Sequence, residues 1–211
     1  MSEKTNRPPL KWLLISSLGI VLVGLVPLVW YETLPDDWHA GRELRSRGFM
    51  VTHNTFLWRQ PTHVFGENRD ITPEDGLLIS RLPHLRSLRF TNCDMLDLNL
   101  DEIGKCRQLD SVHFIGAKRL SVDELRKLAP CPVTNIALYD SDLKDSDLEV
   151  LTELTTIKNL TLSNNAGITD AGLEHLEKIP SLGVLRLYGT GVTQDGVEEF
   201  KKKRPGVSVS L

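Results

Sequence analysis

Hydrophobic residues recur along this chain at a fixed spacing from residue 85 onward. Five segments share the pattern L-x-x-L-x-L, with only aliphatic residues or Phe at the marked positions, and their starts lie 24, 24, 24 and 25 residues apart. The segments begin at Leu85, Leu109, Val133, Ile157 and Leu182. A period of this length marks supersecondary units that cannot bury their apolar side alone and must stack on a shared core. The pattern therefore predicts one strand in each segment and a solenoid built from the stacked units.

A stretch with helical spacing follows several of these strand segments. Residues 121–128, 169–179 and 193–200 each start with Ser or Thr, and Leu or Val follows four residues later. A hydroxyl at a helix start can accept from the free N–H groups of the first turn, and Ser121 with Glu124 has the spacing of a capping box. The alternation of strand and helix predicts an α/β array.

Incomplete units flank the five regular segments. Phe65 is followed six residues later by I-T-P-E-D-G, which mirrors the spacing between Leu162 and the later I-T-D-A-G-L. This spacing predicts a degenerate unit that starts near Gln60. Residues 207–211 alternate at period two where a further strand is due, so they are expected to close the array.

The segment before the degenerate unit has the pattern of an N-terminal cap. Asp36 can start a helix that runs through Leu44, and Gly48 can end it. Residues 49–53 then alternate as a short strand does. Since terminal repeats must cover an exposed core edge, an atypical unit is expected here.

The repeats carry two motifs of a known family. The first is the strand pattern extended to L-x-x-L-x-L-x-x-(small or polar)-x-(aliphatic), and the second is I-T-D-x-G-L at residues 168–173. On these motifs residues 60–211 resemble the leucine-rich repeat family, in its short helix-bearing form, similar to the ribonuclease-inhibitor-like and cysteine-containing types. The resemblance implies a right-handed β-α superhelix with a parallel sheet on its concave face. It also implies action through binding, with no catalytic residues to carry over.

The ninth position of each unit departs from the family pattern, which usually has Asn or Cys there. The residues at this position are Cys93, Ala117, Ser141, Asn165 and Thr190. All except Ala117 have a side chain that can form a hydrogen bond to the turn. We therefore expect four hydrogen-bonded turns and one looser turn at Ala117.

An apolar run near the N-terminus predicts a transmembrane helix over residues 10–31. Lys11 is the only charged residue in this range, and its length matches the about 20 residues needed to cross a bilayer. The prediction divides the chain into a short basic tail at residues 1–9, the helix, a linker and cap at residues 32–59, and the repeats at residues 60–211. A cleaved signal peptide is the alternative, although the run is longer than a usual signal sequence and no A-x-A site follows it.

Charges beside the apolar run predict its orientation. Lys4, Arg7 and Lys11 precede or begin the run, whereas the ten residues after Tyr31 contain no Lys or Arg. Because positive residues stay on the cytoplasmic side, the pattern favours a single-pass signal-anchor with a cytoplasmic N-terminus and the repeats outside.

Composition and motifs argue against several functions. Residues 32–211 hold 22 basic and 27 acidic residues, a net charge of −5, and no clustered basic face, so a nucleic acid partner is not expected. The sequence contains no G-x-S-x-G, H-E-x-x-H, P-loop or C-x-x-C motif, and its six histidines are scattered. Four aspartates in residues 140–147 are a candidate for calcium, but the segment lacks the glycine and glutamate of an EF-hand loop. We predict a protein that is not an enzyme and has no cofactor or metal.

Two cysteines allow a disulfide. Cys106 and Cys131 lie 25 residues apart, each just before a strand segment, so they are expected on neighbouring units. There their Cα atoms can come within the roughly 4.4 to 6.8 Å that a disulfide requires. Two buried thiols, used as small apolar residues, are the alternative.

The concave side of the sheet supplies the candidate binding residues. In L-x-x-L-x-L the third, fifth and seventh positions point away from the core, because strand side chains alternate. Since Arg and Tyr are over-represented at binding hot spots, the candidates are drawn from these positions. They are Arg89, His113, Tyr139, Thr161, Arg186 and Tyr188. A face that is merely solvated is the alternative reading.

The sequence thus favours a membrane-anchored leucine-rich repeat protein that binds a protein partner, or an envelope polymer, through its concave sheet. The alternative is a structural envelope scaffold that associates with its own copies and has no dedicated ligand.

Overall fold

The computed structural model describes residues 36–53, 60–95, 98 and 100–211, and Asp36–Leu211 form one compact unit. Among these residues eight strands form one sheet in chain order. The first two, β1 (Met50–His53) and β2 (Pro61–Glu67), are antiparallel, and every later neighbour is parallel. The later strands are β3 (Ser87–Thr91), β4 (Ser111–Ile115), β5 (Asn135–Tyr139), β6 (Asn159–Thr161), β7 (Val184–Arg186) and β8 (Ser208–Ser210).

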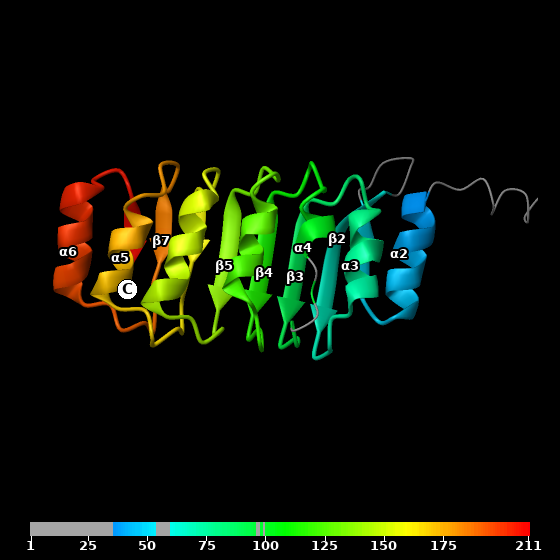
Figure 1. The fold of residues 1–211 in the computed structure, drawn as a ribbon, viewed down its shortest axis with the longest axis horizontal. Helices are drawn as coiled ribbons and strands as arrows, with labels where there is room; N and C mark the ends of the chain where they lie inside the picture. The colour runs from blue at the N-terminus through cyan, green and yellow to red at the C-terminus, as the bar shows by residue number, and fades with distance from the viewer. Residues whose placement is uncertain (1–35, 54–59, 96–97, 99) are drawn as a thin grey trace, which may run out of the picture. The chain divides into compact units, whose positions relative to one another are not determined.

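Helices cover one side of this sheet (Figure 1). They are α2 (Asp36–Ser46), α3 (Pro73–Ser80), α4 (Leu100–Ile103), α5 (Asp170–Leu176) and α6 (Gln194–Lys203), with two 3₁₀ helices, η1 (Val122–Leu128) and η2 (Asp145–Glu153), between α4 and α5. The strands and the helical layer follow the predicted repeat from residue 60 on, including the degenerate unit and the closing strand. The helix and the short strand predicted before the repeats are present, as α2 and β1.

The core lies between the sheet and the helices. The hydrophobic residues of L-x-x-L-x-L are buried, and register brings equivalent positions together, as with Phe90 and Phe114 on β3 and β4. Their rings are stacked with centroids 5.9 Å apart, and Phe49 packs on Phe90 at 6.2 Å. The first repeats and the cap therefore share a column of aromatic rings.

The predicted capping box at Ser121 is wrong. Its side chain forms no capping hydrogen bond, because the backbone N–H of Glu124 donates to the carbonyl of Ser121 at 3.1 Å in a 3₁₀ turn. A capping box does form at the start of α3. The hydroxyl of Thr72 accepts from the N–H of Asp75 at 3.2 Å, and the Asp75 carboxylate accepts from the N–H of Thr72 at 2.9 Å.

Aspartates join successive helix starts. The Asp145 carboxylate accepts from both the N–H and the hydroxyl of Thr169 at 2.7 Å. One repeat later the Asp170 carboxylate accepts from the N–H and hydroxyl of Thr193, at 2.8 and 2.7 Å. The Thr and Asp of I-T-D-x-G-L thus connect the start of α5 to the starts of η2 and α6. In the segment proposed as a calcium candidate, Asp145 has this capping role, and within the described residues no group of three or more His, Cys, Asp or Glu is arranged to hold a metal ion.

The ninth-position side chains bond to the turns as predicted. Asn165 is buried, and its Oδ1 accepts from the N–H groups of Ser141 and Leu143 at 2.9 and 3.1 Å, while its Nδ2 donates to the carbonyls of Leu138 and Leu162. Cys93, Ser141 and Thr190 each donate to one carbonyl two or three residues earlier. Asn165 alone among these four links two repeats through several bonds.

Cys106 and Cys131 are buried free thiols instead of the disulfide that their spacing allowed. The Cys131 Sγ donates to the carbonyl of Gly104 at 3.3 Å, and the Cys106 Sγ lies 4.0 Å from the carbonyl of Ile79. Burial, and secondarily the neighbouring Cys131, raises the pKa of Cys106 to about 12. The geometry thus matches the alternative of two thiols packed as small apolar side chains.

The predicted basic tail at residues 1–9 and transmembrane helix at residues 10–31 lie outside the described residues. Among the residues that are described, no helix combines the length and apolar character required to span a bilayer.

Candidate binding surface of the sheet

The predicted candidates lie on the side of the sheet opposite the buried leucines. We call this side the sheet face and define it by the third, fifth and seventh positions of the five regular repeats. The fifth positions form one row in register, in which Arg89 pairs with His113 and Thr161 pairs with Arg186. These side chains are exposed or half-buried, whereas their neighbours along each strand are buried. The alternation expected from the sequence is therefore confirmed.

Two tyrosines occupy seventh positions on this face, Tyr139 at the end of β5 and Tyr188 two residues after Arg186. Tyr139 is 36% exposed and Tyr188 is 52% exposed. Asn164 connects them, because its Nδ2 donates to the Tyr139 hydroxyl at 2.7 Å and its backbone N–H donates to the Tyr188 carbonyl at 2.7 Å. Thr161 on β6 pairs with Ala137 on β5 and with Arg186 on β7. We call Tyr139, Thr161, Arg186 and Tyr188 the Tyr-Arg patch.

Arg89 and His113 are neighbours on β3 and β4, away from the Tyr-Arg patch. The His113 Nε2 lies 2.9 Å from the Ser111 hydroxyl. Burial, and then the positive charge of Arg89, lowers the pKa of His113 from 6.5. Because the unfolded chain binds the proton more readily, this group favours folding above pH 6.5 and that contribution is lost as the pH falls toward the lower folded value. His113 is therefore neutral at physiological pH and offers a hydrogen bond without charge.

The third-position row is already bonded internally. Asn159 Nδ2 donates to Asn135 Oδ1 at 2.6 Å, and Asn135 Nδ2 donates to the Asp110 carboxylate at 3.3 Å. These amides hold neighbouring repeats together, so the fifth and seventh positions are the better candidates for contact with a ligand.

The turns at the carboxyl ends of the strands share a feature that was not predicted from the sequence, a residue with positive φ in each turn. The residue after the seventh position has a positive φ in successive units: Asn68, Asn92, Gly116, Asp140, Asn164 and Gly189. Only Gly, and less readily Asn or Asp, adopts this left-handed conformation at low cost. The recurrence of these three residue types at the repeat period was the available signal.

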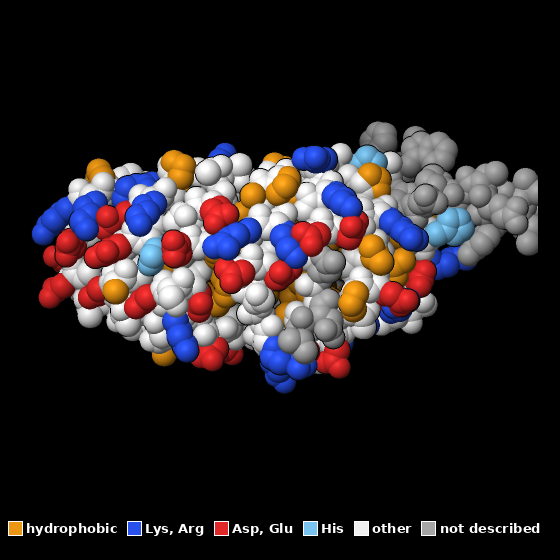
Figure 2. Space-filling model, viewed as in Figure 1, with side chains coloured by type: hydrophobic (Ala, Val, Ile, Leu, Met, Phe, Trp, Pro, Cys, Tyr) orange, Lys and Arg blue, Asp and Glu red, His pale blue; other side chains and the backbone are white. Residues whose placement is uncertain are grey.

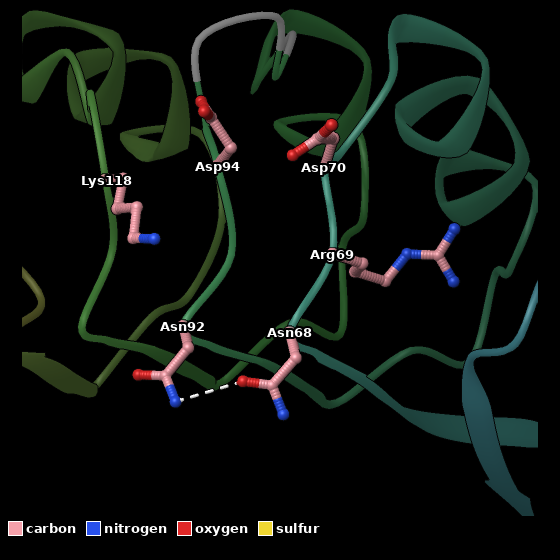
Figure 3. Close-up of a pocket in the computed structure, with 6 residues that line it drawn as sticks. All are labelled: Asn68, Arg69, Asp70, Asn92, Asp94 and Lys118. Atoms are coloured by element: carbon pink, nitrogen blue, oxygen red, sulfur yellow. Dashed lines mark hydrogen bonds between the residues drawn. The ribbon is translucent and has the colours of Figure 1, made fainter.

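A pocket of about 520 Å³ opens beside the first of these turns (Figure 3). Asn92 Nδ2 donates to Asn68 Oδ1 at 3.2 Å, and Asp94 pairs with Arg119 outside the group drawn. The Arg69 side chain points away from the pocket, with its guanidinium 3.9 Å from the centre of the Phe49 ring. Several polar groups here serve to join repeats and the cap.

A second pocket, at the amino ends of the strands, has a volume of about 550 Å³. We call it the His-Arg pocket. Its lining residues are His53, Gln60, Thr62, His63, His84, Arg86 and Gln108. The sequence reading treated these histidines as scattered, because their nearness depends on how β1, β2 and the following turns pair.

The helical side differs from the sheet face. Figure 2 shows positive and negative side chains interspersed over it. Ion pairs join successive helices there, including Lys127 with Asp101 at 2.8 Å, Arg126 with Glu153 at 2.8 Å, and Lys203 with Glu177 at 2.9 Å. Each exposed ion pair of this kind contributes little to the free energy of folding, and the two charges of each pair cancel.

Solved structures similar to this chain come from bacteria and a plant. An internalin of Listeria monocytogenes is 19% identical with a TM-score of 0.49, and the match covers 70% of this chain and 40% of the internalin. An LRR protein of Leptospira interrogans is 15% identical with a TM-score of 0.43, over 64% of this chain and 39% of that protein. The LRR ectodomain of the receptor kinase SOBIR1 from Arabidopsis thaliana is 15% identical with a TM-score of 0.46, and the match covers 74% of this chain and 92% of that ectodomain.

The chain has a leucine-rich repeat fold. Its repeat period, its parallel strands in register and its helical layer carry this assignment. No family model matches the sequence, and no curated protein matches it.

Proposed function

We propose that this chain is a binding module that holds a protein partner on the sheet face, with the Tyr-Arg patch as the centre of contact. The observation that supports this is the exposure of Tyr139, Tyr188 and Arg186 on one face, with both tyrosines bonded to Asn164. Tyr and Arg concentrate binding energy at interfaces, and tyrosine loses little conformational entropy on contact. The repeat core does not require large rings at these positions, since other units have Thr, Ile or Ser there.

The charges of this face favour a partner that presents carboxylates. The fifteen third, fifth and seventh positions include Arg89 and Arg186 and contain no Asp or Glu. Residues 32–211 as a whole have a net charge of −5, so the sheet face is depleted in acidic residues relative to the rest of the unit. An acidic segment with apolar side chains would pair with the arginines and pack on the two tyrosine rings. The proposed role is binding, with no catalytic step.

Affinity capture with the full chain as bait tests this role. The Arg186→Ala, Tyr188→Ala double variant is expected to lose a partner that the unchanged chain retains, with affinity lowered by at least about 2 kcal/mol if both are hot spots. The matched control is Trp38→Ala, Arg81→Ala, which also removes one exposed aromatic ring and one arginine, but from α2 and the end of α3. Equal capture by both variants would argue against the patch, and recovery of only this chain's own copies would favour the self-associating scaffold.

The apolar run at residues 10–31 supports the further proposal that the chain is anchored in a membrane, with the repeats outside. The full chain is then expected to stay with membranes during extraction at alkaline pH, and its repeats should be cleaved by protease added to intact cells. Release into the supernatant would contradict the anchor, and protection from protease would contradict the orientation.

A further inference from the structure

The described residues that line the His-Arg pocket are rich in hydrogen-bond donors, and none of them is a carboxylate. They include Arg86, three imidazoles and the side-chain amides of Gln60 and Gln108. Asp110, two residues after Gln108, is engaged with the next repeat, since its carboxylate accepts from the Thr134 hydroxyl at 2.5 Å and from an asparagine amide. The described lining of the pocket therefore presents positive charge and N–H groups without an anion.

Hydrogen bonds orient two of the imidazoles. The Gln108 amide nitrogen donates to His84 Nδ1 at 3.3 Å, which places the proton of neutral His84 on Nε2. His63 Nδ1 lies 2.9 Å from the hydroxyl of the buried Thr62, so this contact engages Nδ1 and not Nε2. His53 differs, because Arg45 donates to its Nε2 at 3.0 Å. His63 and His84 are thus the rings suited to donate to a ligand.

The backbone of Arg86 is fixed at the edge of the sheet. Its N–H donates to the Thr62 carbonyl at 2.7 Å, and its carbonyl accepts from the N–H groups of Asp110 and Ser111 at 2.9 and 3.0 Å. The guanidinium, on an exposed side chain, is planar and offers two parallel donors, a geometry that matches phosphate and carboxylate oxygens. A fixed backbone reduces the freedom that this side chain loses on binding.

We propose that the His-Arg pocket binds an oxyanion of the phosphate or sulfate type, with Arg86 as the charged ligand and His63 and His84 as N–H donors. Several acceptor oxygens on one compact group match several convergent donors, which a single carboxylate matches less well. The volume of about 550 Å³ falls within the range of roughly 300 to 1,000 Å³ for small-molecule sites. The pocket therefore has room for a phosphate ester on a sugar as well as for the free anion.

Isothermal titration of the full chain in a nonionic detergent tests the proposal, with inorganic phosphate and glucose 6-phosphate as probes and glucose as the uncharged comparison. Saturable binding of at least one phosphate probe is expected. Arg86→Gln should weaken it by at least about tenfold, because a charged hydrogen bond is lost. His84→Gln should weaken it by about threefold or more, as expected for loss of a neutral donor. Tighter binding of the sugar phosphate would identify an ester as the ligand class, and tighter binding of phosphate would identify the free anion.

Lys158→Gln is the matched control. Lys158 has the same place in its repeat as Arg86, and its N–H likewise donates to a carbonyl of the preceding repeat, that of Thr134, at 2.8 Å. This variant removes the same charge from the same edge of the sheet but leaves the pocket intact, so its affinity should stay unchanged. An equal loss in Lys158→Gln would reveal general charge attraction and overturn the site, as would the absence of saturable binding to either phosphate probe by a folded chain.

Discussion

Phe114→Ala is expected to lower the free energy of unfolding by about 3 to 5 kcal/mol, the usual cost of removing a buried phenylalanine ring. The Phe114 ring is fully buried and stacks on Phe90 with centroids 5.9 Å apart. Phe90 in turn packs on Phe49 of the cap, at 6.2 Å. A cavity at this site would therefore weaken the contact between the regular repeats and the cap. Urea unfolding followed by circular dichroism measures the change.

Tyr188→Ala provides the comparison for this prediction. Tyr188 is 52% exposed, so its removal should change stability by no more than about 1 kcal/mol. A loss at Tyr188 as large as that at Phe114 would mean that the tyrosine is part of the core, and the case for a separate binding surface would fail.

Gly104→Ala is expected to lower stability by about 2 to 3 kcal/mol, near the upper part of the usual range for overpacking. A Cβ at the buried Gly104 would meet the backbone carbonyl oxygen of Lys127, in η1, at 2.1 Å. Because that oxygen belongs to the next helix, the two repeats would have to separate. In a domain of this size the loss corresponds to a fall in Tm of roughly 4 to 12 °C, which a thermal melt detects.

Gly206→Ala is the control for the crowding argument. A Cβ at Gly206 would have nothing within 4 Å, and this glycine has no positive φ. The substitution should be neutral or stabilise by up to about 1 kcal/mol, because it restricts the unfolded chain. If Gly104→Ala melted at the same temperature as Gly206→Ala, the close approach of α4 and η1 would be wrong.

The array could be predicted from the sequence because each repeat has the same apolar positions, which only neighbouring repeats can cover. The repeat period places equivalent residues side by side on neighbouring strands, as with Leu88, Val112 and Ile136. This alignment gives the observed register of β3, β4 and β5. The orientation of the fifth and seventh positions followed from strand alternation alone. For this reason the exposure of Arg186 and Tyr188 could be anticipated.

Local hydrogen bonding was harder to anticipate than register. Ser121 and Glu124 have the spacing of a capping box, but the N–H of Glu124 donates to the carbonyl of Ser121 and not to its hydroxyl. The spacing of apolar residues does not distinguish a 3₁₀ turn from an α-helical turn, and residues 122–128 form a 3₁₀ helix.

The His-Arg pocket could not be predicted from the repeat. His53 precedes the regular repeats, and the antiparallel pairing of β1 with β2 brings it beside Pro61 and thus near residues of the pocket. His84 and Gln108 occupy the same position in successive repeats, so the repeat period alone predicts that these two residues are neighbours. The position of His53 could be known only from the antiparallel pairing of β1 with β2.

Photo-crosslinking in intact cells tests the proposed role of the sheet face most directly. A photoreactive amino acid at Thr161, between Tyr139 and Arg186 on the Tyr-Arg patch, is expected to give an adduct with a partner protein. The same amino acid at Glu174, exposed on α5, should give none. An adduct from Glu174 with none from Thr161 would place binding on the helical side, and adducts formed only with this chain's own copies would replace the binding module with a self-associating scaffold.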